Sequence, residues 1–370
     1  MAQVAIRRPP FRADHVGSLL RPQELRTAFR QHAQGELDAP QFAEILHKAI
    51  RDVVRLQEEV GLKVVTDGEF RRSSYWGRFV ERCRGFAIMP AQFRFRDDQG
   101  QEVDFTATYA AAKLTRDQPL ATDEFAFLRQ VTEATPKITL PAPSTMHFYR
   151  CGDFADPDVY ADAATFFADL ARIYRAEIAD LIKAGCRYVQ LDEVAVAMLC
   201  DPAIREKIAS SGQDPDLLVD LYIGAINDCV ADVGPDVAIG VHMCRGNFRG
   251  RYLSEGGYES VAERFFANTR VTHFLLEYDS PRAGDFKPLR FVPKDKGVVL
   301  GLVSTKTPVL ESIEDLERRT GEAAKFIDLN RLGLGPQCGF ASTAAGNPLT
   351  EADERAKLSR IVEAARRIWS

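Results

Sequence analysis

Four side chains suited to binding zinc stand at the ends of predicted strands. His242 and Cys244 lie two residues apart at one strand end, so both side chains point to the same side if the strand geometry persists. Glu277 ends the next strand and Cys338 ends the strand two beyond it. Imidazole and thiolate ligands favour zinc over magnesium or calcium, and His-Cys₂-Glu is a complete tetrahedral set. A core histidine beside a buried thiol is the alternative for the His-x-Cys pair alone.

The elements that must position these ligands alternate along the chain. β-Branched runs such as residues 61–66 alternate with longer segments of helical periodicity such as 41–60. Strands are predicted near residues 14–17, 61–66, 137, 187, 237, 271, 298 and 331, and further helices at about 158–184, 214–233, 256–268, 311–327 and 351–368. Eight βα units predict an α/β fold, a (β/α)₈ TIM barrel, in which functional residues gather at the C-terminal ends of the strands. An open doubly wound sheet is disfavoured because no Gly-rich dinucleotide turn follows a strand.

One region departs from this alternation. Residues 75–136 contain no clean βα unit, but Phe93–Arg96 alternates apolar and basic residues, Asp97–Gly100 has turn composition, and Val103–Phe105 alternates again. This pattern predicts a β-hairpin. We therefore expect one barrel domain over residues 1–370, with a hairpin-containing insertion after the second strand, at about 75–136, that leans over the barrel mouth.

Composition excludes several classes of protein. Hydrophobic residues make up 45% and charged residues 27% of the 370 residues, which is typical of soluble globular proteins. The 48 basic and 53 acidic residues give a net charge of −5, without the clustered basic excess of a nucleic-acid surface. No run approaches the roughly 18 apolar residues of a membrane span, and Arg7–Pro10 has no signal-peptide character. Seven scattered cysteines are expected to be reduced, in the cytoplasm.

Several motifs together resemble the catalytic half of cobalamin-independent methionine synthase. The motifs keep their order and their strand-end positions from about residue 13 to 345, nearly the whole chain. They are His15-Val16-Gly17-Ser18, Asp67-Gly68-Glu69, Leu140-Pro141-Ala142-Pro143-Ser144-Thr145-Met146, Leu191-Asp192-Glu193, Val241-His242-Met243-Cys244-Arg245-Gly246-Asn247-Phe248 and Gly335-Pro336-Gln337-Cys338-Gly339.

The resemblance implies a zinc-dependent transferase that methylates homocysteine to methionine. The zinc ligands of the family match His242, Cys244, Glu277 and Cys338. A free thiol has a pKa of about 8.5, and coordination to zinc deprotonates it while leaving a nucleophilic sulfur.

The family also implies how homocysteine is held. In the family, the backbone at positions that match Gly17 and Ser18 of the first strand binds homocysteine. The amino group of homocysteine binds carboxylates that match Glu69 and Asp192. Salt bridges from these carboxylates to Arg71 or Arg72, without a substrate role, are the alternative.

The chain departs from the family on the side of the methyl donor. Long methionine synthases carry a second, N-terminal half that is absent here. Lys306 stands where the family has a proton-donating histidine, Met198 replaces an acidic folate contact, and Tyr149 lies where a tryptophan stacks on the pterin. Lys306 is expected to act as a general acid or to anchor an anionic donor, unless it is a solvated loop lysine.

Three functions follow from these features. The first is homocysteine S-methylation, with methylfolate, methylcobalamin or a methyl-corrinoid protein as donor. The second is a zinc-dependent alkyltransferase for another thiol, such as epoxyalkane:coenzyme M transferase-like activity, for which Arg94 and Arg96 would meet the sulfonate. The third is a non-catalytic zinc-binding barrel that passes a thiol or corrinoid to a partner. The intact carboxylates Glu69 and Asp192 favour an amino-acid thiol.

Overall fold

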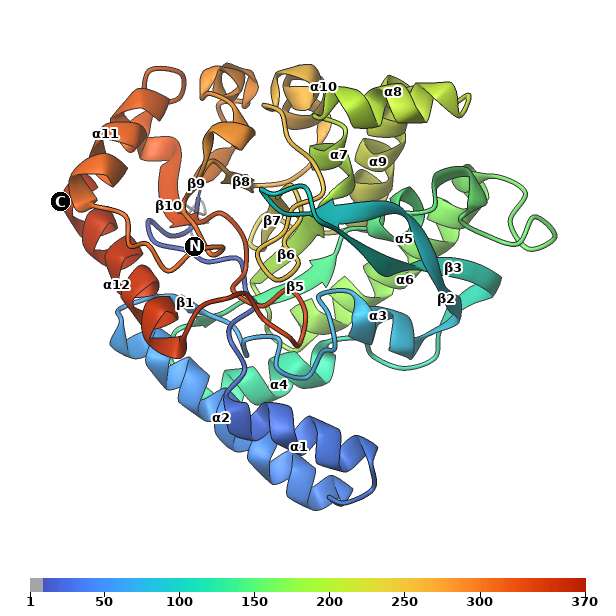
Figure 1. Cartoon of the computed structure of the whole chain (residues 1–370), viewed down its shortest axis with the longest axis horizontal. Coiled ribbons are helices and arrows are strands. Elements are labelled where there is room, and N and C mark those ends of the chain that lie inside the picture. The colour runs from blue at the N-terminus through green and yellow to red at the C-terminus, as the bar shows by residue number, and fades with distance from the viewer. Residues whose placement is uncertain (1–8) are drawn as a thin grey trace.

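A ring of short strands lies at the centre of the molecule, with helices around it (Figure 1). The computed structural model describes residues 9–370. Six strands form one parallel sheet in the order β10-β9-β8-β7-β6-β5. They are β5 (Ile138–Pro141), β6 (Tyr188–Glu193), β7 (Ala238–Met243), β8 (His273–Glu277), β9 (Gly297–Val303) and β10 (Leu332–Pro336). Every residue of these six strands is buried, as expected for parallel strands covered on both faces.

Two further segments extend this sheet at its ends. At one end β4 (Thr135–Pro136) runs directly towards β5 and pairs in parallel with β1 (Val64–Val65). At the other end Ala13 pairs in parallel with Leu334 of β10. Inside the ring, the buried Lys137 ammonium lies 2.8 Å from Asp14 Oδ1, which ties the first strand segment to the third.

Contacts between the segment that follows Ala13 and the segment that follows β1 complete the ring. The backbone N–H of Leu19 donates to the carbonyl of Gly68 at 3.1 Å. The Thr66 hydroxyl donates to the carbonyl of Gly17 at 2.6 Å. The predicted (β/α)₈ barrel is therefore confirmed, with its functional rim at the C-terminal ends of the strands.

The first two strands are shorter than the sequence predicts. The expected strand at 14–17 is reduced to a single bridge at Ala13, and the expected strand at 61–66 to β1. Gly61 adopts φ 95°, and the N–H of Leu62 bonds back to the carbonyl of Gln57 at 3.1 Å. Residues 61 and 62 therefore finish the preceding helix instead of starting the strand.

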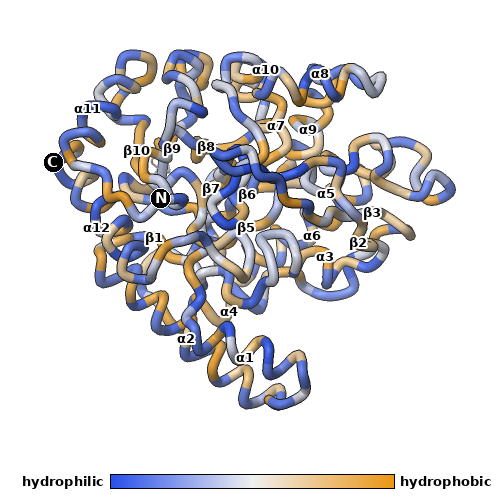
Figure 2. The backbone as a smooth tube through the Cα atoms, viewed as in Figure 1, coloured by the Kyte–Doolittle hydropathy of each residue, from blue (hydrophilic) through white to orange (hydrophobic). Residues whose placement is uncertain are grey.

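The helices surround the barrel and alternate along their length between hydrophobic and hydrophilic residues (Figure 2). They are α1 (Gln23–Ala33), α2 (Ala39–Glu59), α3 (Gly77–Arg82), α4 (Thr122–Val131), α5 (Thr145–Phe148), α6 (Ala163–Lys183), α7 (Ala195–Met198), α8 (Pro202–Ser210), α9 (Pro215–Cys229), α10 (Glu259–Asn268), α11 (Ile313–Ala323) and α12 (Glu351–Ile368). Capping boxes begin α2 at Asp38 and α12 at Thr350. Within residues 9–370 no helix is long and apolar enough to cross a bilayer.

The insertion after the second strand contains the expected hairpin, which is longer than the sequence indicates. β2 (Cys83–Arg96) and β3 (Glu102–Arg116) pair in antiparallel register around the turn at 97–101. Reciprocal backbone hydrogen bonds between Arg96 and Tyr252, at 2.8 and 3.0 Å, join the hairpin to the loop that follows β7. The hairpin is thereby held over the barrel rim, as predicted.

A buried carboxyl on α12 makes stability sensitive to pH. Burial raises the pKa of Glu354 to about 8, and its carboxyl accepts the backbone N–H of Leu20 at 2.8 Å. Because the pKa of Glu354 is higher in the folded than in the unfolded chain, its contribution to the free energy of unfolding is fully present below the unfolded-state pKa. This contribution is lost as the pH rises towards 8. In Glu354→Gln we expect that loss to disappear, leaving the variant more stable than the parent at pH 8.5 by on the order of 1 kcal/mol or more. Urea unfolding at pH 5 and 8.5 measures this, and an unchanged pH dependence would contradict it.

Candidate metal centre and active-site cavity

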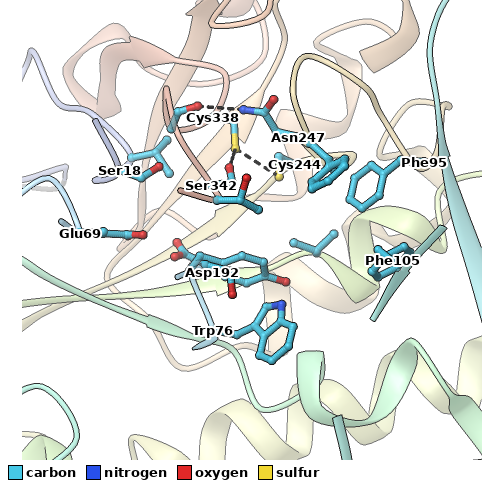
Figure 3. Close-up of a pocket in the computed structure, with 18 of the residues that line it drawn as sticks. Ser18, Glu69, Trp76, Phe95, Phe105, Asp192, Cys244, Asn247, Cys338 and Ser342 are labelled. Atoms are coloured by element: carbon cyan, nitrogen blue, oxygen red, sulfur yellow. Dashed lines mark hydrogen bonds between the residues drawn. The ribbon is translucent and has the colours of Figure 1, made fainter. Parts of the chain in front are cut away.

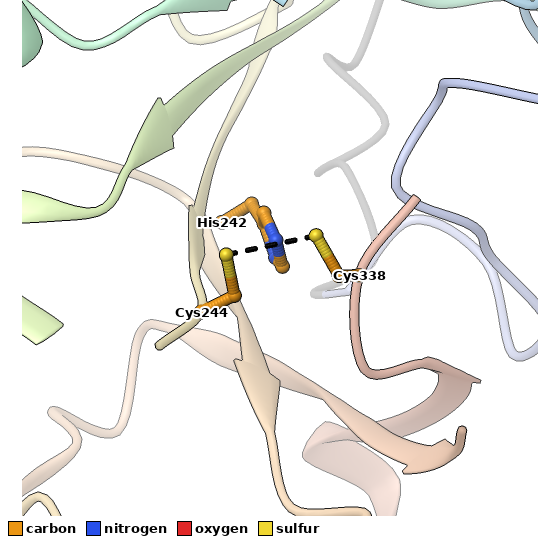
Figure 4. A group of neighbouring side chains, drawn as sticks. All are labelled: His242, Cys244 and Cys338. Carbon is orange, nitrogen blue, oxygen red and sulfur yellow. Dashed lines mark hydrogen bonds between the residues drawn. The ribbon is translucent and has the colours of Figure 1, made fainter. Parts of the chain in front are cut away.

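Three of the four predicted zinc ligands come together at the barrel rim. The ligand atoms of His242 and Cys244, at the end of β7, and of Cys338, just after β10, all lie within 4.8 Å of one another (Figure 4). Two sulfurs bound tetrahedrally at about 2.3 Å each would lie about 3.8 Å apart. The Sγ atoms of Cys244 and Cys338 are 3.6 Å apart, so the pair fits a shared zinc ion.

The imidazole of His242 is oriented as a metal ligand should be. Its Nδ1 lies 3.2 Å from the carbonyl oxygen of Leu275, which fixes the ring and the tautomer. Its buried Nε2 makes no hydrogen bond with any described residue. A ring held from its far nitrogen, with the other nitrogen turned towards two thiols, matches the usual outer-shell arrangement of zinc-binding histidines.

The two thiols share a polarised environment. The hydrogen bond between Cys338 and Cys244 lowers the pKa of Cys338 well below its usual value, and His242 and Lys306 add to the effect. A lowered pKa favours the thiolate, which is the form that binds zinc. None of the other five cysteines takes part in this cluster.

Glu277, the fourth predicted ligand, lies beside the cluster instead of within it. Its Oε2 accepts the backbone N–H of Arg245 at 2.7 Å. Its Oε1 is buried, makes no hydrogen bond with any described residue, and lies 3.5 Å from the Nζ of Lys306. Burial would raise the pKa of Glu277, but Lys306 and Arg245 lower it, so the carboxylate is charged. Its role as a zinc ligand stays a prediction.

Lys306 is buried and not a solvated loop lysine. Its side chain is only 7% exposed. Burial alone would lower the pKa of Lys306, yet Glu277 and Asp279 raise it, which keeps the ammonium charged. The amine faces Glu277, and Lys306 does not line the cavity described below. Its predicted roles as acid or donor anchor remain untested by this geometry.

A cavity of about 290 Å³ opens at the cluster of His242, Cys244 and Cys338 (Figure 3). The predicted substrate residues Ser18, Glu69, Asp192 and Tyr149 all line it, together with the three clustered ligands. Gly17 is not among the lining residues. It adopts φ 135°, and a Cβ there would meet Thr139 Cγ2 at 2.7 Å and Glu69 Oε1 at 3.3 Å.

Two carboxylates form one end of this cavity. Asp192, at the end of β6, receives a hydrogen bond from Gln190 Nε2 at 2.7 Å. Burial and the nearby Glu69 raise the pKa of Asp192 to about 7. A pair of buried carboxylates that repel one another is suited to receive an ammonium group.

Glu69 is held in place by a buried network. Its Oε1 accepts the Thr139 hydroxyl at 2.6 Å, and Thr139 in turn accepts Arg72 Nη1 at 2.8 Å. Arg72 Nη2 also lies 2.7 Å from Glu124 of α4. Glu69 has φ 59°, in the left-handed region, which its backbone N–H bond to Asp67 Oδ1 at 2.9 Å helps to hold. Arg72 is 3.5 Å from Glu69, so the expected contact with this arginine exists and coexists with a position on the cavity wall.

The other end of the cavity is aromatic, and sequence reasoning missed most of it. The ring residues that line the cavity are Tyr75, Trp76, Phe95, Phe105, Tyr149 and Phe248. Four of the six come from the insertion. Phe95 and Phe105 follow the alternation of the predicted hairpin, and that alternation is the signal that was available. Tyr75 and Trp76, which precede α3, carried no comparable pattern.

Known proteins resemble this chain along most of its length. The family model described as "Cobalamin-independent synthase, Catalytic domain" matches residues 11–367. The uncharacterised Bacillus subtilis protein YxjH is 41% identical over 98% of this chain and 96% of its own length. A methionine synthase of Pyrococcus furiosus is 27% identical over 88% of this chain and 85% of its own length.

A solved structure agrees with these matches. A candidate vitamin-B12-independent methionine synthase from Listeria monocytogenes superposes with a TM-score of 0.76 at 31% identity, covering 97% of this chain and 98% of the other. The resemblance inferred from the motifs is thereby confirmed. The chain is a methyltransferase-class enzyme and belongs to the family of cobalamin-independent synthase catalytic domains.

Proposed function

We propose that this protein is a zinc-dependent S-methyltransferase that transfers a methyl group to the thiol of homocysteine, giving methionine. One observation carries the proposal. The same cavity presents the cluster of His242, Cys244 and Cys338 and, on another part of its wall, the carboxylates of Glu69 and Asp192. Homocysteine has a thiol at one end and an ammonium at the other, which matches this pair of subsites. The name of the Pyrococcus furiosus relative supports the same reaction.

The residues at the sulfur end fit zinc and a substrate thiol. His242, Cys244 and Cys338 would bind the ion. Glu277 would be the fourth ligand, or the ligand that the substrate thiol displaces. Zinc, when bound, supplies the positive charge that keeps a substrate thiol deprotonated at neutral pH. Lys306 would hold the Glu277 carboxylate, whose Oε1 is 3.5 Å from its amine.

The two carboxylates on the cavity wall would orient the amino acid. Asp192 and Glu69 would accept hydrogen bonds from the ammonium, and Ser18 lines the same cavity. The ammonium would also remove the repulsion between the two carboxylates, which contributes to the raised pKa of Asp192. Binding of the thiol at the cluster and of the ammonium at the carboxylates would hold the sulfur in the cavity that the aromatic residues also line.

An Asp192→Asn variant tests this assignment. We expect homocysteine to bind about ten- to a hundredfold more weakly, because a charged hydrogen bond in a buried site contributes roughly 1.5–3 kcal/mol. The affinity for 4-mercaptobutyrate, which has the thiol but no amino group, should change little. Calorimetry on the zinc-loaded protein gives both values. Equal losses of affinity for the two thiols would show that Asp192 does not bind the amino group.

A sulfonate thiol such as coenzyme M is less well matched. Arg94 is paired with Glu102 and Asp104 on the hairpin, at 3.1 and 2.8 Å, and does not line the cavity. Arg96 also lies outside it, 3.2 Å from Glu255. The expected basic partners of a sulfonate are therefore turned away from the thiol site.

The donor and the compartment complete the proposal. Methylfolate, methylcobalamin and a methyl-corrinoid protein are the donors that the sequence leaves open, and the homocysteine end of the cavity suits all three. All seven cysteines are free thiols, which agrees with a reducing compartment such as the cytoplasm. Homocysteine supplied with each donor, and methionine measured by mass spectrometry, tests the reaction. Homocysteine that neither binds nor is methylated would overturn it.

A further inference from the structure

The aromatic end of the cavity is a continuous wall of rings. Phe105 meets Phe95 edge-on at 4.9 Å between centroids and Tyr149 at 5.0 Å and 90°. Phe95 also contacts Phe248 at 5.2 Å, and the hydroxyls of Tyr75 and Tyr149 are 3.1 Å apart. This wall lines the same cavity as the clustered sulfurs (Figure 3). The second substrate of a methyl transfer must therefore bind against aromatic faces and edges.

Apart from His242 of the cluster, the charged side chains on the cavity wall are carboxylates. Among residues 9–370, no lysine or arginine lines the cavity, while Glu69 and Asp192 do. With zinc and homocysteine bound, the two cysteinates, the carboxylates of Glu277, Glu69 and Asp192, and the substrate thiolate and carboxylate would carry seven negative charges, against four positive charges from zinc, Lys306 and the substrate ammonium. The cavity is thus matched electrostatically to a cation, and an anionic donor would find no partner on its wall.

The size of the cavity sets a further limit. Ligand pockets usually measure about 300–1,000 Å³, and this cavity of about 290 Å³ lies at the lower end of that range. A donor with a compact methyl-bearing end fits this space. Rings around a methylated cation are also the recognised way in which proteins bind quaternary ammonium groups.

We propose that the methyl donor is a small onium compound, with its methyl group on a positively charged sulfur or nitrogen held by Trp76, Phe95 and Phe105. This inference rests on the proposed function and names its second substrate. The homocysteine thiol gives its proton to water, and the thiolate attacks the methyl carbon. The new sulfur–carbon bond forms as the carbon–onium bond breaks. The bonding pair stays on the leaving sulfur or nitrogen, which departs as a neutral sulfide or tertiary amine.

The identity of residue 306 is consistent with this chemistry. A neutral sulfide or amine leaves without receiving a proton, so the reaction needs no general acid on the donor side. Lys306, which stands where the family has a proton-donating histidine, directs its amine at Glu277 and is absent from the cavity wall.

A binding experiment tests the cation site without turnover. Choline and its neutral isostere 3,3-dimethylbutan-1-ol are titrated into the zinc-loaded protein by calorimetry. We expect choline to bind about tenfold more tightly, in line with a desolvated cation–π contact. Phe95→Leu should lower that preference several-fold, because it keeps an apolar side chain but removes the ring. Equal affinity of the parent protein for the two probes would overturn the proposal.

The same strand provides a matched control. Phe93 lies two residues before Phe95, packs on Phe148 at 5.0 Å, and lines only an outer groove. Phe93→Leu should leave the preference for choline unchanged. If Phe95→Leu fails to fold, Trp76→Leu replaces it. If the preference for choline survives Trp76→Leu and Phe95→Leu, or falls equally in Phe93→Leu, the aromatic residues of the cavity do not bind the cation.

Turnover separates this proposal from the proposed function. Homocysteine is incubated with methyl-labelled S-methylmethionine, glycine betaine, 5-methyltetrahydrofolate or methylcobalamin, and labelled methionine is measured. Label from either of the first two supports the onium donor and identifies the heteroatom. Label only from methyltetrahydrofolate or methylcobalamin would overturn the onium donor and leave homocysteine methylation standing. Label from none of the four would overturn the onium donor, and if homocysteine also fails to bind in calorimetry, it would overturn homocysteine methylation as well.

Discussion

A Cys244→Ser/Cys338→Ser variant is expected to retain almost no zinc and to have no measurable methyl transfer. Each serine replaces a thiolate with a hydroxyl that stays protonated at neutral pH, so only His242 and Glu277 of the four proposed ligands remain. The barrel should remain folded, because its buried strands and their helices form the core without the metal. Metal analysis after dialysis, with circular dichroism, measures both outcomes.

The chain offers a matched control for this double substitution. Cys151 and Cys186 are also buried, and their thiols contact the carbonyl oxygens of Phe148 and Tyr188 at 2.9 and 3.3 Å. A serine hydroxyl preserves both interactions, so Cys151→Ser/Cys186→Ser should keep its zinc. Full zinc in the Cys244/Cys338 variant, or equal loss in the control, would remove the two cysteines from the metal site.

Lys306→Met should destabilise the metal-free protein by about 3–5 kcal/mol. The substitution leaves the charged Glu277 carboxylate buried without its ammonium partner at 3.5 Å, and an unpaired buried charge has about that cost. Zinc should recover most of the lost stability, because the ion offers Glu277 a new positive charge and binds only the folded chain. Urea unfolding with and without zinc gives the free energy of unfolding in each state.

Another buried lysine serves as the control. Lys357 lies 3.1 Å from Glu311, and its side chain is 1% exposed. Lys357→Met should also destabilise the protein, but zinc should not recover the loss selectively. A metal-free Lys306→Met protein as stable as the parent would show that the lysine does not hold Glu277. In the zinc-loaded variant, a rate loss of about 10² to 10⁴ confined to donors whose leaving group needs a proton would instead identify a general acid.

The strand-end motifs predicted the barrel and the proximity of His242, Cys244 and Cys338. Helical periodicity and β-branched runs repeat eight times, and the C-terminal ends of parallel strands share one rim. Residues as distant as His242 and Cys338 could therefore be placed together without knowledge of any distance. The ends of the first strands were less predictable, because Gly61 ends a helix inside what looked like a strand.

The donor end depends on tertiary contacts that no local pattern encodes. The hairpin was predictable from alternation, but its position over the rim depends on backbone pairing between Arg96 and Tyr252. The pairing of Lys306 with Glu277 likewise links the ends of β9 and β8, and sequence alone placed this lysine on an open rim. The direction of the Lys306 side chain depends on its contact with Glu277, which no spacing in the sequence indicates.

X-ray absorption at the zinc edge tests the central claim most directly. The protein purified with about one zinc per chain should show two sulfur ligands with nitrogen and oxygen making up the rest of the shell. Adding homocysteine should raise the sulfur count to three. A shell of only nitrogen and oxygen, or a sulfur count that homocysteine does not change, would contradict the assignment of this site to thiol methylation.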